Sequence, residues 1–438
     1  MKQSILSKDG VSYVVPFILI TSCFALWGFA NDITNPMVKA FSKIFRMSAT
    51  DGALVQVAFY GGYFAMAFPA AMFIRRYSYK AGVLVGLGLY ALGAFMFYPA
   101  KMTGEYYPFL IAYFILTCGL SFLETSSNPY ILSMGTEETA TRRLNLAQSF
   151  NPMGSLLGMY VAMNFIQAKL NPLDTASRAG LTPVEFEAVK EYDLSVLIGP
   201  YLAIGLVILA MFVLILFWRM PKNGDKNHNI DFVPTLRRIF AMPHYREGVI
   251  AQFFYVGVQI MCWTFIIQYG TRVLMADGMA EQAAEVTSQQ YNILAMIIFC
   301  CSRFICTFLL RYVNTGRLLT VLAIVGGLLV VGVIGLQNIY GLYCLVGVSA
   351  CMSLMFPTIY GIALTGLGDD AKFGAAGLIM AILGGSVLPP LQAAIIDQVE
   401  LLGMPAVNVS FILPFVCFVV IAIYGHRTFL RSKGQLGG

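Results

Sequence analysis

Two carboxylates fall inside long apolar stretches of this sequence. Glu124 stands in SFLETSSNPY, with Ser127 and Asn128 shortly after it, and Asp32 stands in WGFANDITNP. An ionised carboxylate in hydrocarbon costs several kcal/mol, so it is kept where a cavity, a partner or a proton is available. Burial favours the neutral form, which makes Glu124 a candidate for a reversible proton carrier. A structural role is the alternative for both residues, with Asp32 satisfied by backbone or by an arginine elsewhere and Glu124 in a salt bridge from another helix.

The polar residues around Asp32 suggest a binding surface. Asn31 precedes it and Asn35 follows it, and their helical spacing places much of this polarity on one face. Pro36 removes an amide N–H just beyond, which loosens the helix near the site. Asp32, Asn31 and Asn35 are therefore candidate substrate-binding residues.

Two further stretches carry amides at helical spacing. One polar stripe lies along a helix face in RRLNLAQSFNPMGS and consists of Asn145, Gln148, Asn151 and Ser155. A second lies in QFFYVGVQIMCWTF and consists of Gln252, Tyr255, Gln259 and Trp263. Amides both donate and accept hydrogen bonds, as sugar hydroxyls require, and an aromatic ring suits the apolar face of a sugar. Packing between membrane helices would use the same residues. Gln148, Asn151, Tyr255 and Gln259 are the preferred candidates.

Arg303 lies too deep in an apolar stretch to be a simple end anchor. It could pair with an acidic residue or with an Asn or Gln carbonyl, and a purely structural contact is the favoured interpretation. The stretch GAAGLIMAILGGSVLPPLQ is rich in small residues and contains Pro389-Pro390, which suits a helix that bends or slides, although close packing would need the same glycines.

The elements that must position these residues are membrane helices. The chain has 438 residues, of which 58% are hydrophobic and 11% charged, whereas soluble chains carry roughly 25% charged residues. Runs of about 20 mostly apolar residues can cross a bilayer. The predicted spans are 12–41, 52–74, 80–99, 106–133, 144–168, 194–218, 246–271, 287–310, 317–337, 340–364, 373–396 and 407–426. The first is predicted to be retained rather than cleaved.

The charges predict the orientation. Most Lys and Arg residues fall in loops on one predicted side, so both termini are expected in the cytoplasm. The mixed loop 169–193 and the acidic segment from Asp277 to Glu285 are expected outside. The nine cysteines fall inside predicted spans without metal-type pairs and are interpreted as apolar filler.

The chain is predicted to have two related halves, residues 1–220 and 244–438, joined by a polar cytoplasmic linker at 221–243. Arg76-Tyr77 follows the second span and Arg311-Tyr312 follows the eighth, while Pro129 and Pro357 occupy the fourth and tenth. Two matches at nearly one offset indicate a parallel repeat of six helices, which is the organisation of major facilitator transporters. The fold class is thus all-α and polytopic, with twelve transmembrane helices in two pseudo-symmetric bundles.

Catalysis on the substrate is not indicated. The sequence has no HExxH, no CxxC pair and no phosphate loop, and its three histidines lie in or beside predicted cytoplasmic loops. A proton-driven exporter of lipophilic cations is a second class, but the amides favour a sugar. An anion exchanger would want intramembrane cations in both halves, and only Arg303 is found.

Several segments resemble the fucose:proton symporter family of the major facilitator superfamily. They are LETSSNPY, RRLNLAQSFNPMG, RYSYKAGVLVGLGLYALGA, QFFYVGVQIMCW, MFPTIYGIALTGLGDDAKFGAA and LGGSVLPPL. The resemblance implies import of a neutral hexose with a proton, with Glu124 as proton carrier and Asn151 as a sugar-contacting or relay amide. It extends to Gln148, Tyr255 and Gln259 as cavity residues.

The first helix departs from the pattern of that family. The family's acidic position aligns with Asn35, while Asp32 aligns with an asparagine, so either Asp32 has taken over the acidic role or Glu124 acts alone while Asp32 tunes sugar choice. L-fucose is the expected substrate, with galactose, glucose or another hexose next. Sodium, ligated by Asp32 and neighbouring oxygens, is the alternative coupling ion. The resemblance implies no other cofactor, no nucleic-acid partner, a monomer, and a place in a bacterial cytoplasmic (inner) membrane.

Overall fold

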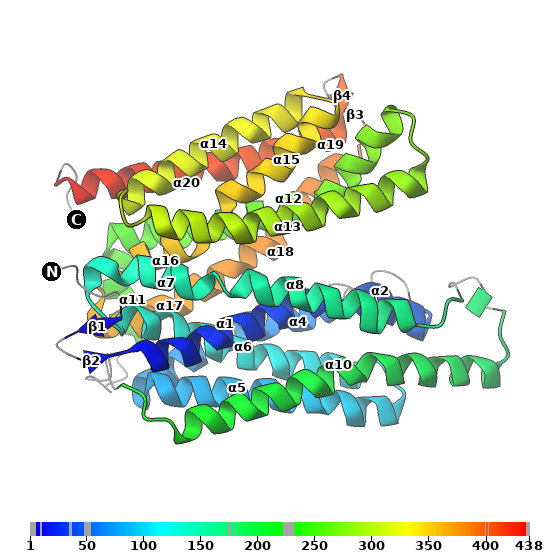
Figure 1. Ribbon diagram of the computed structural model, residues 1–438, viewed down its shortest axis with the longest axis horizontal. Coiled ribbons are helices and arrows are strands. Elements are labelled where there is room, and N and C mark those ends of the chain that lie inside the picture. Colours follow the sequence, from blue (N-terminus) through cyan, green and yellow to red (C-terminus); the bar gives the residue numbers. More distant parts are fainter. Residues whose placement is uncertain are drawn as a thin grey trace. The chain divides into compact units, whose positions relative to one another are not determined.

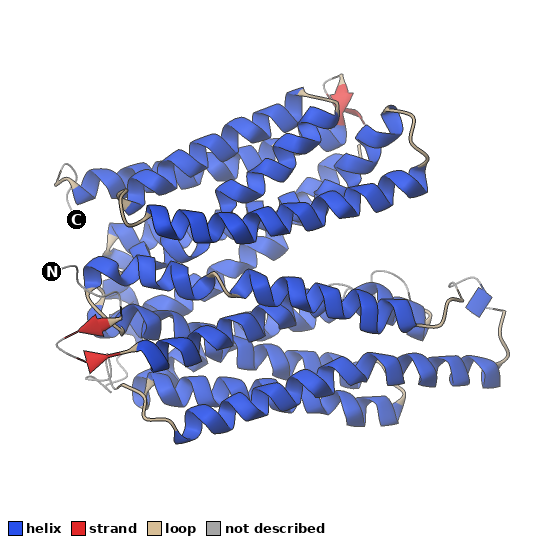
Figure 2. Ribbon diagram, in the orientation of Figure 1, coloured by secondary structure: helices blue, strands red, loops and turns tan. Residues whose placement is uncertain are grey.

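The computed structural model of the protein is almost entirely helical (Figure 2). It describes residues 6–8, 11–34, 37–47, 54–173, 177–178, 180–221, 232–398, 400–401 and 403–434. By their contacts, these residues divide into two compact units. The N-unit comprises the described residues of 6–134 and 150–230, and the C-unit those of 135–149 and 231–438.

The N-unit contains a short antiparallel hairpin and a bundle of long helices, labelled in Figure 1. Its elements are β1 (Ser7–Lys8), β2 (Val11–Ser12), α1 (Val14–Thr34), α2 (Met37–Phe45), α4 (Leu54–Arg76), α5 (Tyr79–Thr103), α6 (Tyr107–Ser133), α8 (Asn151–Val161), the π-helical turn η2 (Ala162–Ile166), η3 (Gln167–Lys169) and α10 (Pro183–Phe217).

The C-unit begins with a segment that lies far from the rest of it in sequence. Its elements are η1 (Glu137–Thr139), α7 (Ala140–Gln148), α11 (Phe232–Ala241), α12 (Pro243–Ala276), α13 (Glu281–Leu309), α14 (Thr315–Gly335), α15 (Ile339–Met352), α16 (Met355–Leu364), η4 (Gly368–Asp370), α17 (Ala371–Met380), η5 (Ala381–Leu383), α18 (Gly384–Ile396), β3 (Glu400–Leu401), β4 (Met404–Pro405), α19 (Ala406–Val409) and α20 (Ile412–Ser432). An apolar core from α12, α14, α15 and α20 fills this unit.

Within the described part of the chain, eleven helices are long and apolar enough to cross a membrane. The predicted fifth span, 144–168, corresponds to α7 and α8, which are separated by a turn at Ser149 and Phe150. The predicted first span, 12–41, corresponds to α1 followed by α2. Asn35 and Pro36 fall between these helices and lie outside the described residues.

The start of the sixth span differs from the prediction. The charged segment before residue 194, expected as loop, forms the first turns of α10, which begins at Pro183. Thr182 accepts a hydrogen bond from the Glu185 amide, and the Glu185 side chain accepts one from the Thr182 amide. This capping box supplies partners for amides at the helix start and explains the earlier boundary.

The eleventh span is interrupted at a different place from the Pro389-Pro390 pair, where the sequence suggested a bend. Pro389 and Pro390 lie inside α18, and the break falls earlier, at η5. Gly384 lies against the Phe253 carbonyl there, where a Cβ would overlap main-chain atoms. Close approach to α12 therefore governs the path of this segment. Of the predicted linker 221–243, residues 222–231 lie outside the described part, and α11 occupies most of the remainder.

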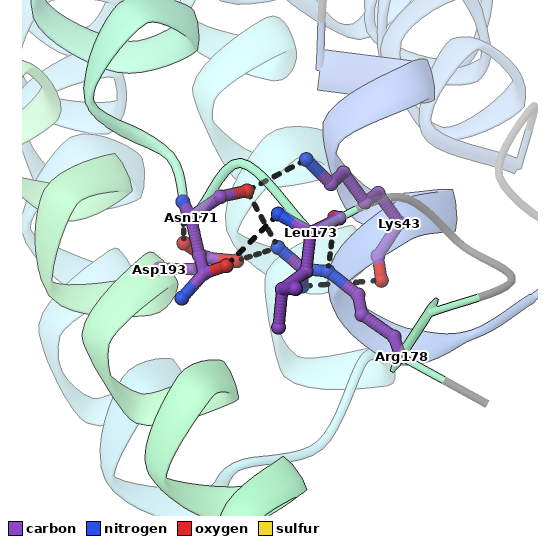
Figure 3. A network of polar contacts seen from close by, with 5 residues as sticks. All are labelled: Lys43, Asn171, Leu173, Arg178 and Asp193. Atoms are coloured by element: carbon purple, nitrogen blue, oxygen red, sulfur yellow. Dashed lines mark hydrogen bonds and ion pairs between the residues drawn. The ribbon is translucent and has the colours of Figure 1, made fainter. Parts of the chain in front are cut away.

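One buried polar network lies in the N-unit where α2, the segment after η3 and the start of α10 meet (Figure 3). Arg178 and Asp193 are both fully buried and form an ion pair at 2.6 Å. The Arg178 guanidinium also donates to the carbonyls of Leu173, Asn171 and Lys43. Asp193 Oδ1 accepts the Asn171 amide at 2.7 Å. Every arm of this ion pair is thus hydrogen-bonded, as a buried pair requires.

Candidate functional site

Glu124 lies in the buried middle of α6, the most thoroughly buried of the N-unit's long helices. The Tyr63 hydroxyl of α4 donates to Glu124 Oε1 at 3.0 Å. Tyr63 is held in turn through its carbonyl, which accepts the Ser121 hydroxyl at 3.1 Å. Glu124 Oε2 is buried and has no hydrogen-bond partner among the described residues. Buried carboxylate oxygens are usually satisfied, so this one is available for a proton.

No cation pairs with Glu124 in the described part of the chain. The side chain that contacts its carboxylate is a neutral phenol, and Asn128 Nδ2 donates to the Glu124 backbone carbonyl rather than to the carboxylate. A permanently ionised group here would be costly, whereas a protonated one needs no countercharge. Sequence reasoning missed Tyr63. The i, i+3 pair of Tyr60 and Tyr63 in an apolar span was the available signal.

Asp32 and Asn31 lie near the end of α1 and are partly exposed, unlike Glu124. Asp32 interacts electrostatically with Tyr60, which stands one helical turn before Tyr63 on α4. Asp32 and Glu124 therefore each interact with a tyrosine of α4, and these tyrosines, Tyr60 and Tyr63, lie one turn apart. Asn35 lies outside the described residues.

Asn151 begins α8 and faces α1. Its Nδ2 donates to the Phe24 carbonyl at 3.2 Å, and the Ser155 hydroxyl donates to the Gly28 carbonyl at 3.3 Å. The helices approach closely because glycines line the contact. A Cβ at Gly28 would overlap the Asn151 carbonyl, and one at Gly158 would lie 2.5 Å from the Phe29 carbonyl. We call this contact, formed by Gly28, Gly154, Gly158, Asn151 and Ser155, the glycine seam.

The remaining predicted residues belong to the C-unit. Tyr255 is completely buried in α12, and its hydroxyl donates to the Met352 carbonyl at 3.2 Å. Gln259, one turn further along α12, is partly exposed, while Gln252 is buried. Trp263 Nε1 donates to the Ser349 hydroxyl at 3.1 Å. Of the two predicted amides on α12, Gln259 is therefore the one that is partly exposed.

Gln148 ends α7 and is buried. Its backbone carbonyl accepts Arg303 Nη1 at 3.0 Å. On the same helix, Asn145 Nδ2 donates to the Thr358 hydroxyl of α16 at 3.1 Å. The stripe predicted for the fifth span is thus shared between units: Asn145 and Gln148 pack in the C-unit, and Asn151 and Ser155 in the N-unit.

The comparisons with known proteins agree with this architecture. A model of the Major Facilitator Superfamily matches residues 20–389. The L-fucose-proton symporter of Haemophilus influenzae is 52% identical over 99% of this chain and all of its own length. The L-fucose-proton symporter of Escherichia coli is 32% identical over 95% of this chain and 93% of its own, and a glucose/galactose transporter of Brucella abortus is 29% identical over 93% and 92%.

Solved structures give the same result. A crystal structure of the major facilitator transporter FucP in the outward conformation superposes with a TM-score of 0.85 at 31% identity, covering 95% of this chain and 99% of that one. The proton:xylose symporter XylE, at 11% identity and a TM-score of 0.66, shares the fold.

This chain belongs to the Major Facilitator Superfamily, and it is a polytopic membrane transporter with the twelve-helix fold of that family rather than an enzyme. The two relatives named above that exceed 30% identity over their sequences are both L-fucose-proton symporters.

Proposed function

We propose that this chain imports L-fucose together with a proton by alternating access. The identity of 52% over the full length of an L-fucose-proton symporter supports the sugar. The more distant glucose/galactose transporter makes galactose and glucose the second candidates. The single observation that carries the coupling is Glu124, a buried carboxylate with one oxygen bound to a neutral phenol and the other without a described partner.

Glu124 would couple the two fluxes through its desolvation cost. When Glu124 is ionised and has no countercharge, reorientation of the carrier requires the free energy of keeping a bare charge out of water. A proton on Oε2 neutralises the carboxylate and removes this free-energy cost. Sugar binding that favours the protonated form would then let the loaded carrier reorient in preference to the half-loaded one. Such coupling is a free energy shared by two sites and acts reciprocally on sugar and proton.

The candidate sugar ligands are the partly exposed polar residues within each unit. Asn31, Asp32 and Asn151 offer carboxylate and amide groups in the N-unit, and Gln259 offers an amide in the C-unit. Tyr255 would position the main chain at Met352 through its hydroxyl, whereas the main chain of Gln148 is itself held by Arg303. In this assignment Asp32 binds sugar, while Glu124 carries the proton.

The proposed setting rests on the charges and the family. The transporter works as a monomer in the bacterial cytoplasmic membrane, surrounded by lipid, with both termini in the cytoplasm. A proton is the coupling ion and no other cofactor takes part; sodium near Asp32 is the alternative.

The test measures external pH in lightly buffered, de-energised cells on addition of L-fucose, galactose or glucose. Cells expressing the wild type are compared with Glu124→Gln and with the matched control Glu187→Gln, an exposed carboxylate on α10. Alkalinisation with L-fucose, retained in the control and absent in Glu124→Gln, supports proton symport. Sugar uptake without a pH change, but with dependence on external sodium, would show that the coupling ion is sodium and not a proton. Alkalinisation by galactose or glucose, and not by L-fucose, would show that the substrate is that other hexose.

A further inference from the structure

Arg303 of α13 joins two main-chain carbonyls that belong to two different interrupted helices. Its Nε donates to the Ser353 carbonyl at 2.5 Å, and its Nη1 donates to the Gln148 carbonyl at 3.0 Å. The guanidinium is buried and stands over the Phe299 ring at 4.6 Å. Because an arginine has several donors in a fixed plane, one side chain can serve both acceptors.

Both carbonyls lack the i+4 donor of a regular α-helix for the same reason. In an α-helix the carbonyl of residue i accepts the N–H of residue i+4. Residue i+4 is Pro152 for Gln148 and Pro357 for Ser353, and proline has no N–H. At each place the helix stops, turns through two residues, and resumes as α8 or α16. Arg303 supplies the hydrogen bonds that the two prolines cannot donate.

The two acceptors differ in how the chain continues. Ser353 is surrounded in sequence by residues of the C-unit. Gln148 belongs to the segment 135–149, which packs in the C-unit although the residues before it and after it belong to the N-unit. The bond from Arg303 therefore lies at the end of this segment, next to the point where the chain passes from one unit to the other.

We propose that Arg303 is a positioning residue for transport: its guanidinium clamps the end of α7 to the break between α15 and α16, and the Gln148 arm is made and released in each cycle. The Ser353 arm stays closed and keeps the guanidinium aimed. Arg303 touches neither sugar nor the coupling proton in this role. It sets the fraction of carriers in which α7 is held by the bond from Arg303 to Gln148, and so acts by shifting the populations of two states.

The first test is a double-mutant cycle on the uptake of radiolabelled L-fucose, with Arg303→Lys, Pro152→Ala and the double variant. Lysine keeps the charge but loses the planar fork, and alanine at 152 gives the Gln148 carbonyl a donor of its own. We expect the maximal rate to fall about tenfold in Arg303→Lys and about threefold in Pro152→Ala, with KM unchanged within about twofold. The double variant should match Arg303→Lys within about twofold, because the same bond is lost. Arg311→Lys, an exposed arginine beyond the same helix, is the matched control.

Three results would overturn the proposal. If the fold losses in maximal rate of the two single variants multiply in the double variant, Arg303 and the Gln148 carbonyl act independently. A rise in KM at an unchanged rate would make Arg303 a sugar ligand. Unchanged kinetics in both single variants would leave the clamp without a role. If Arg303→Lys does not fold, Pro152→Ala and Pro357→Ala keep the arginine and test the same two bonds.

The kinetic test rests on the proposed function, so a second measurement is independent of it. Hydrogen exchange by mass spectrometry on the purified transporter should be faster over residues 140–149 in Arg303→Lys than in the wild type and unchanged over α20. Faster exchange throughout the C-unit would instead show a general structural role and overturn the clamp. A wild type that takes up no L-fucose but shows the local exchange effect would reject the proposed function alone.

Discussion

The Tyr63 hydroxyl donates to Oε1 of Glu124 at 3.0 Å, while Oε2 of the same carboxylate has no partner among the described residues. In the proposed mechanism this asymmetry gives the two oxygens different roles. Oε1 fixes the orientation of the carboxylate, and Oε2 remains the place where a proton can be gained or lost.

Removal of the Tyr63 hydroxyl tests this division. In Tyr63→Phe the carboxylate loses the hydrogen bond that orients it, and we expect sugar-driven proton uptake to be about three- to tenfold slower, because a hydrogen bond contributes about 0.5–1.5 kcal/mol. The rate of external alkalinisation on addition of L-fucose measures this. Tyr77→Phe is the matched control, since Tyr77 is an exposed tyrosine just beyond the same helix. Equal rates in both variants would remove Tyr63 from the proton site.

The assignment of Asp32 to the sugar predicts a different effect from that of Glu124. Asp32→Asn should raise KM for L-fucose about tenfold, as expected for loss of one charge-assisted hydrogen bond, and should keep sugar-induced alkalinisation. The two quantities are read in one experiment that varies the sugar concentration. Uptake that continues without any pH change in Asp32→Asn would transfer the coupling role to Asp32.

The buried pair of Arg178 and Asp193 predicts strong non-additivity. Arg178→Met leaves Asp193 buried without its cation and should cost about 3–5 kcal/mol of stability, whereas Arg178→Met combined with Asp193→Leu should recover most of that loss. The measurement is the midpoint of thermal unfolding in detergent. A double variant no more stable than Arg178→Met would show that the surrounding carbonyls, rather than the charge pair, hold this region.

The glycine seam predicts that a single methyl group is harmful at one position and tolerated at another. Gly158→Ala would bring a Cβ to 2.5 Å from the Phe29 carbonyl, so the helices must separate, at a cost of about 1–3 kcal/mol. Gly199→Ala on α10, where no atom lies within 4 Å, is the control. Unfolding midpoints and uptake rates should fall in the first variant and stay unchanged in the second. A similar loss in both would point to helix flexibility rather than contact.

Hydropathy was sufficient to predict a helical membrane fold, because membrane spans are recognisable by length and composition. The family was predicted from the resemblance of several segments and is confirmed by the comparisons. The boundaries that failed are instructive. The early start of α10 depended on Thr182 and Glu185, a local capping signal hidden within charged residues that resembled a loop. The break in the fifth span is explained by Pro152, which removes one hydrogen bond at a position that hydropathy does not sense.

The site was predicted less completely, because a sequence shows which residues are polar but not which are satisfied. Glu124 was found from its place in an apolar span, whereas its partner Tyr63 lies on another helix and is apolar enough to be read as packing. Arg303 was interpreted as making a purely structural contact, and its acceptors could not be predicted because they are main-chain carbonyls, which carry no residue identity. Side chains that bind main chain leave no pairwise pattern in one sequence.

The glycine seam also bears on how binding energy is divided between the two open states of the carrier. Glycines let the main chains of α1 and α8 meet at this contact, and the Asn151 side chain adds a hydrogen bond across it, so little side-chain packing is left to deform between the helices that carry Asp32 and Asn151. If Asp32 and Asn151 bind the sugar as proposed, we expect the difference in affinity between loading and release to come from residues outside the glycine seam.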